Sequence, residues 1–123
     1  MTRAGLRDMS ITELVNRFAT AALGQYEAEL RSDIAKQNKF VEQAMAIASE
    51  LKSRPRDQRS ALRKLYDHPN VQVRLNAARM TLAIAPTSAR ELVQAIADSK
   101  QYPQAGDAGM CLWALDQGIF TPS

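Results

Sequence analysis

The segment that follows Pro69 constrains the fold more than any other stretch of the chain. Residues 71–85, VQVRLNAARMTLAIA, are predicted to form one helix, because Asn70 is a good N-cap and Pro86 disfavours helix at the residue before it. This helix carries two apolar stripes on nearly opposite sides, formed by Val71, Leu75, Ala78, Leu82 and Ala85 and by Val73, Ala77, Met80 and Ile84. A helix at the edge of a small bundle needs only one such stripe. The pattern therefore predicts an inner helix of a stacked helical array.

Apolar residues at helical spacing predict further helices on both sides of this segment. Ser10 and Glu13 form a capping box that opens the first long helix, Pro55 ends the second, and Gly118 stops the last. Strand-like alternation is missing, so we expect an all-α fold of about six helices, a short HEAT/ARM-like α-α superhelix. The predicted order is a helical hairpin over 11–52 followed by helix pairs over 57–85 and 88–118, all within one domain of residues 1–123.

Composition places the chain among ordinary globular proteins. Hydrophobic residues make up 46% and charged residues 24%, and the formal net charge of +3 makes the protein mildly basic. A single cysteine excludes an intramolecular disulfide and is typical of a reducing compartment. The opening residues, MTRAGLRDMS, lack the apolar core of a signal peptide, and no apolar run has the length of a bilayer span. We therefore expect a soluble cytoplasmic protein without a membrane partner.

The stretch DHPNVQVRLNAARMTLA resembles the signature of HEAT repeats: an acidic turn with proline, then Val-Arg, paired alanines and a leucine one turn later. These positions are Asp67, Pro69, Val73, Arg74, Ala77, Ala78 and Leu82. The resemblance implies structural roles for Asp67 and Arg74, with the arginine bonding acidic or carbonyl groups in the turns. The chain as a whole is also similar to a bacterial family of short HEAT-like proteins without an assigned function.

Catalytic chemistry has little support in the sequence. The chain has one histidine, His68, in the turn before residue 71, and one cysteine, Cys111, on an apolar helix face. A nucleophile needs a nearby base, and a metal site needs several ligands at suitable spacing, so these two residues predict neither. No phosphate-binding glycine motif occurs. We expect no enzyme activity, no catalytic residue, no metal and no cofactor.

One charge feature stands out, the basic stretch over residues 52–64. It contains Lys52, Arg54, Arg56, Arg59, Arg63 and Lys64, and Asp57 is its one acidic residue. The spacing of Arg56, Arg59 and Arg63 predicts one basic helix face, continued by Lys64. Such a face can contact phosphates, an acidic protein surface or only water. The stretch lacks the interleaved aromatics that single-strand binders use for stacking.

The function predicted from these patterns is a non-catalytic protein–protein interaction module that presents a helical-repeat surface. Gln72, Asn76 and Arg79 are expected on the solvent side of the helix that begins at residue 71, as contact residues. The alternative is a nucleic-acid-binding protein that uses the basic stretch. Trp113, with Met110, either fills the core or lies exposed on the last helix as a contact surface. The sequence leaves partner identity and oligomeric state open.

Overall fold

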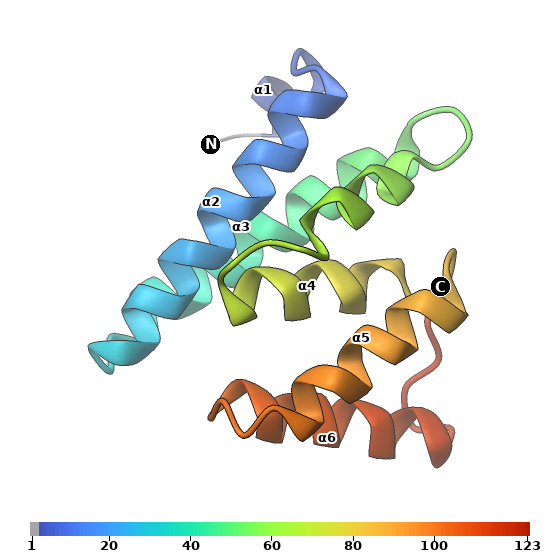
Figure 1. Ribbon diagram of the computed structural model, residues 1–123. Coiled ribbons are helices and arrows are strands. Elements are labelled where there is room, and N and C mark those ends of the chain that lie inside the picture. Colours follow the sequence, from blue (N-terminus) through green and yellow to red (C-terminus); the bar gives the residue numbers. More distant parts are fainter. Residues whose placement is uncertain (1–2) are drawn as a thin grey trace. The chain divides into compact units, whose positions relative to one another are not determined.

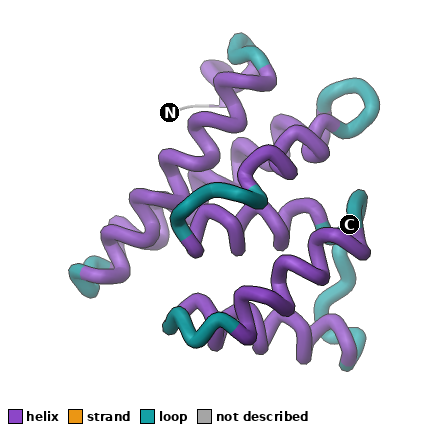
Figure 2. The backbone as a smooth tube through the Cα atoms, in the orientation of Figure 1, coloured by secondary structure: helices purple, strands orange, loops and turns teal. Residues whose placement is uncertain are grey.

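The computed structural model describes residues 3–123, and all regular structure in that part of the chain is helical (Figure 1). Short loops join the helices (Figure 2). The all-α class expected from the sequence is confirmed. The helices are α1 (Arg3–Arg7), α2 (Ile11–Leu30), α3 (Ile34–Ser53), the 3₁₀ helix η1 (Gln58–Leu65), α4 (Val71–Thr81), α5 (Pro86–Asp98) and α6 (Gln104–Asp116).

The chain divides into two compact units, Met1–Ala61 and Leu62–Ser123. The first unit contains α1, α2 and α3, and the second contains α4, α5 and α6. The boundary falls within η1, inside the helix pair that the sequence assigned to residues 57–85.

In the first unit, α2 packs along α3 as the predicted hairpin, which ends at Ser53, one residue later than expected. The backbone N–H of Glu13 donates to the Ser10 hydroxyl at 3.1 Å, which confirms the predicted cap. The hydroxyl in turn donates to the Glu13 carboxylate at 3.3 Å, so the reciprocal bond involves the side chain of Ser10. The buried residues lie on one face of each helix: Leu14, Val15, Phe18, Ala21, Ala22 and Ala28 on α2, and Ala44, Ile47, Ala48 and Leu51 on α3.

Gly24 of α2 lies against the aromatic ring of Phe40 on α3. A Cβ atom built on Gly24 would lie 2.7 Å from Cδ1, Cε1 and Cζ of Phe40. Because carbon atoms in ordinary contact are about 3.5–4.0 Å apart, the ring occupies the space that a side chain at position 24 would need. The glycine thus permits this contact between the two helices.

The five-residue helix α1, which the sequence analysis did not predict, is held by Arg54. One Nη2 atom of Arg54 donates to the carbonyl oxygens of Leu6 at 3.1 Å and Met9 at 2.7 Å. Its Nε atom pairs with the Glu50 carboxylate at 3.0 Å. Carbonyl groups at a helix C-terminus have no hydrogen-bond donors within the helix, so the Arg54 guanidinium donates to them instead.

In the second unit, α4 packs against α5 and α6, and α5 and α6 form an antiparallel hairpin (Figure 1). The predicted burial of both stripes of α4 is confirmed. Met80 and Ile84, at the end of one stripe, are half-buried rather than solvated. The fully covered residues on the two sides are Val71, Leu75 and Ala78, and Val73 and Ala77, each at most 5% exposed.

The predicted extension of α4 to residue 85 is wrong, because the helix ends at Thr81. The carbonyl oxygen of Thr81 accepts from the N–H groups of Ile84 at 3.1 Å and Ala85 at 2.8 Å, which closes a turn. Ala85, with φ −139° and ψ 61°, lies outside the α-helical region, as expected before a proline, and Pro86 is the first residue of α5. The last helix begins at Gln104, and Gly118 at φ 70° follows its end as expected.

Candidate interaction surfaces

The basic stretch does not present the single helical face that its spacing predicted. Arg56 and Asp57 both have positive φ angles, 68° and 49°, so Arg56 precedes the helix. Residues Gln58–Leu65 form a 3₁₀ helix, in which every third residue shares an edge. Arg59 is therefore aligned with the buried Leu62 and Leu65, and its side chain is only 11% exposed. The grouping of Arg56, Arg59 and Arg63 on one face is wrong, because the α-helical repeat assumed for it does not occur.

Arg59 is committed to a contact within the loop. Its Nε atom donates to Oδ1 of Asp57 at 2.9 Å and its Nη2 atom to Oδ2 at 2.6 Å, a bidentate pair. The hydrogen bond from Arg59 lowers the pKa of Asp57, and the same bond raises the pKa of Arg59. Arg56, Arg63 and Lys64 are exposed, as is Lys52 at the end of α3.

The prediction that Gln72 lies on the solvent side of α4 is wrong, since this side chain is only 2% exposed. Its Oε1 atom accepts from Nε2 of Gln104, also 2% exposed, at 3.1 Å, and its Nε2 atom donates to Oδ1 of Asn76 at 2.8 Å. Partners at α6 and α4 satisfy the amide, so its burial is tolerated. Asn76 is half-buried, while Arg79 is exposed, as expected for a contact residue.

The turn before α4 places the residues of the repeat-like signature. Nη1 of Arg74 donates to the carbonyl oxygen of His68 at 2.7 Å, the bond to a turn carbonyl that the resemblance implied. Nδ1 of His68 accepts from the backbone N–H of Asn70 at 3.0 Å, and Oδ1 of Asn70 caps α4. Asp67 is exposed, and its carboxylate has no hydrogen bond or ion pair within residues 3–123, so its structural role is unsupported.

Reactive groups do not converge in the described residues. Cys111 is buried, as predicted, and burial raises the pKa of its thiol, which keeps it protonated. Among residues 3–123, no three His, Cys, Asp or Glu side chains are grouped closely enough to hold a metal ion.

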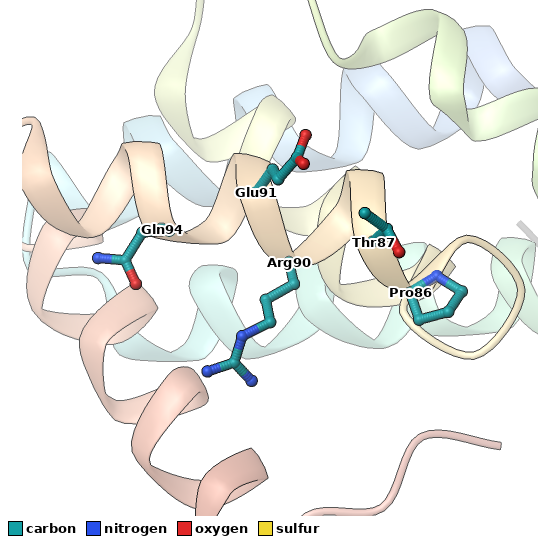
Figure 3. A pocket seen from close by; sticks show the side chains of 5 residues that line it. All are labelled: Pro86, Thr87, Arg90, Glu91 and Gln94. Carbon is teal, nitrogen blue, oxygen red and sulfur yellow. The ribbon is translucent and has the colours of Figure 1, made fainter.

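A hollow of about 470 Å³ lies along the exposed side of α5 (Figure 3). Arg90, the one cationic residue of this lining, pairs with Asp116 at 2.8 Å, and both side chains are about half exposed. The lining contains no pairing of a nucleophile with a base, so it does not form a catalytic constellation. The residues that line the hollow are Pro86, Thr87, Arg90, Glu91 and Gln94.

The outer face of α6 is apolar and exposed, which decides the question that the sequence left open for Trp113. Trp113 is 51% exposed and Met110 is 63% exposed, on the side opposite the buried Ala108 and Leu112. Gly106, Met110 and Trp113 follow one another at positions i, i+4 and i+7, which share one helix face. The face includes one aromatic side chain from the preceding loop.

That side chain is Tyr102, which is 71% exposed. Its Cδ1 atom lies 3.8 Å from the position of a Cβ atom built on Gly106. Tyr102, Met110 and Trp113 are together called the α6 strip below. Tyr102 could not be predicted as part of this face from the sequence, because a loop residue has no helical register to place it there.

The fold and these surfaces define a small all-α protein whose most distinctive described feature is an exposed apolar helix face. A family model described as a domain of unknown function (DUF2019) matches residues 12–116, and the chain belongs to this family. The chain is similar to a solved structure, that of the protein RPA1889 from Rhodopseudomonas palustris CGA009, with 49% identity and a TM-score of 0.94. The match covers 96% of this chain and 98% of that chain.

The resemblance to an uncharacterised bacterial family is thereby supported. A search of curated proteins gave no match. None of the helices in residues 3–123 has both the length and the apolar character needed to cross a bilayer.

Proposed function

We propose that this protein is a non-catalytic protein-binding module and that the α6 strip is part of its binding surface. The observation that carries the proposal is the exposure of Met110 at 63% and Trp113 at 51% on one face of a well-packed helix. Burying a large aromatic side chain against a partner is strongly favourable, and tryptophan is enriched among residues that dominate binding energy. Arg79 and the partly exposed Asn76 are further contact candidates on α4.

The proposal includes a HEAT-like arrangement of the second unit. Its support is the Arg74 bond to the turn carbonyl of His68, together with the complete burial of Ala77 and Ala78, each 0% exposed. Repeat arrays of this kind stack their helices into extended concave surfaces, which they use for binding. We place the module in the cytoplasm, since its single cysteine is buried and unpaired with another cysteine.

Site-specific photo-crosslinking in the native host tests the proposal. A benzophenone amino acid replaces Trp113 in one variant and Met45, an exposed residue of α3, in a matched control. We expect protein adducts from position 113 that the control at position 45 does not give. Equal adduct patterns at the two positions, or none at 113, would overturn the proposal.

The alternative is nucleic-acid binding through the exposed Arg56, Arg63 and Lys64. The pairing of Arg59 with Asp57 leaves fewer free cations than the sequence suggested. Three phosphate contacts would give a slope of about −2.7 for log affinity against log salt concentration on duplex DNA. Titration of fluorescent DNA and RNA at low salt, with R63Q/K64Q as the comparison variant, decides this alternative. Binding that is absent at low salt, or unaffected in the variant, excludes it.

A further inference from the structure

We infer that the partner of the α6 strip is the same strip of a second copy of this chain, packed antiparallel about a two-fold axis. The inference rests on the proposed function and names the occupant of its surface. Symmetric two-fold dimers place the same patch of both copies in contact, so the patch must complement itself in shape and charge.

The shape of the strip meets this requirement. Trp113 projects at one end of it, and Gly106 leaves a position without a side chain two helical turns away. With the axis beside Met110, midway between these residues, the Trp113 indole of each copy lies over Gly106 of the other. The Tyr102 ring beside Gly106 then forms one wall of the receiving position and an aromatic partner for the indole.

The charge of the strip also permits self-association. None of its three side chains is charged, and residues 101–123 contain no lysine or arginine. Asp116 is already neutralised by Arg90 of its own chain at 2.8 Å, which leaves Asp107 as the exposed carboxylate bordering the strip. A partner with a strongly charged contact face would find little complementary charge here, whereas an identical uncharged strip meets no strong repulsion.

The available area fits a weak dimer. A large side chain that is half to three-quarters exposed leaves on the order of 100–150 Å² open to a partner. Three such side chains per copy, with the polar residues at their rim, bring the total buried surface to about 1,000 Å², the lower limit for specific interfaces. We therefore expect dissociation in the micromolar range, on the order of 10–100 μM.

Sedimentation equilibrium of the full chain from 1 to 300 μM tests for this dimer. We expect a monomer–dimer equilibrium that salt leaves unchanged or tightens, because the contact is apolar. M110D should weaken dimerisation at least 10-fold, and W113A about as much. M45D is the matched control, since Met45 is 55% exposed on α3 and outside the strip. A monomer at every concentration, or a dimer that M110D and W113A leave intact, overturns the inference.

Cysteine cross-linking tests the antiparallel arrangement in a C111A background, after circular dichroism has shown that this variant folds. Position 110 lies beside the axis, so M110C should form an intermolecular disulfide readily when a mild oxidant such as copper phenanthroline is added to accept the two electrons. Residues at position 117 of the two copies would lie about 20 Å apart along the helices, so Q117C should not. The reverse pattern excludes the antiparallel packing.

The crosslinking experiment at position 113 separates failure of this inference from failure of the proposed function. Adducts to the protein itself support both proposals. Adducts only to another protein, with a monomer in sedimentation, overturn the self-association and leave the protein-binding function standing. The absence of any adduct at 113 overturns the proposed function.

Discussion

Replacing Gly24 with alanine should destabilise the protein, although alanine is the better helix former. In an exposed helix interior this replacement stabilises by about 1 kcal/mol, because glycine loses more backbone entropy. Here the new Cβ atom would lie 2.7 Å from three atoms of the Phe40 ring, so the ring or the helix must move by nearly 1 Å. Overpacking of this kind costs about 1–3 kcal/mol, which leaves a net destabilisation of about 0–2 kcal/mol for G24A.

Removal of the ring should reverse the sign of the effect. In an F40A background the added methyl group has room, so G24A should stabilise by about 1 kcal/mol and the two positions should couple by about 1–3 kcal/mol. G109A is a matched control within a helix, because a Cβ atom on Gly109 meets nothing within 4 Å. We therefore expect G109A to be stabilising in the otherwise unchanged protein.

Urea unfolding followed by far-ultraviolet circular dichroism, at low micromolar protein concentration, measures these differences. A change of 1 kcal/mol shifts the midpoint by about 0.5 M for an m value of about 2 kcal/mol/M. Stabilisation by G24A of the same size with and without the Phe40 ring would show that the ring does not clash with a side chain at position 24. Equal behaviour of G24A and G109A in the parent protein would show the same.

Three further predictions concern polar contacts. D57N should destabilise by about 1 kcal/mol or less at pH 7, because it removes the Arg59 pair and retains a residue that tolerates positive φ. Because the pKa of Asp57 is lowered in the folded protein, this stabilisation is present above about pH 4 and is lost at lower pH as the carboxylate protonates. The free energies of unfolding of the parent and of D57N should therefore converge as the pH is lowered. R54M should release α1 and lower the free energy of unfolding by about 1–3 kcal/mol, which limited proteolysis would detect as faster cleavage before residue 10. R54K should not restore the protection, because an ammonium group lacks the fork of donors that a guanidinium has. Q104L should lower the free energy of unfolding measured in urea by about 1–3 kcal/mol, because it leaves the buried Oε1 of Gln72 without its donor. Unchanged stability would show that water reaches that atom.

Features set by residues close together in the sequence were predicted correctly, and a feature set by residues far apart was not. The caps at Ser10 and Asn70 were predictable because donor and acceptor lie within three residues of each other. The two-sided burial of α4 was predictable because the helical repeat fixes which residues share a side. The exposure of Gln72 was predicted wrongly, because its partner Gln104 is 32 residues away and belongs to another helix. No local sequence pattern predicts such a hydrogen bond between two amide side chains.

In the basic stretch, too, one feature was evident from the sequence and another only from the structure. Its charge was evident from the sequence. Its 3₁₀ geometry and the positive φ angles of residues 56 and 57 just before it were not, because no residue pattern in the stretch distinguishes a 3₁₀ helix from an α-helix. Only the folded chain separates Arg59, held by Asp57, from the exposed Arg63.

The all-α class, the long helices and their caps follow from local features of the sequence, namely hydrogen bonds between near neighbours and the spacing of apolar residues. Tertiary structure alone decided that Gln72 is buried and that Trp113 is exposed. An amphipathic pattern indicates only that a side chain can be buried against a neighbouring helix. Whether it is covered depends on which helices pack beside it, and those contacts join residues far apart in the chain.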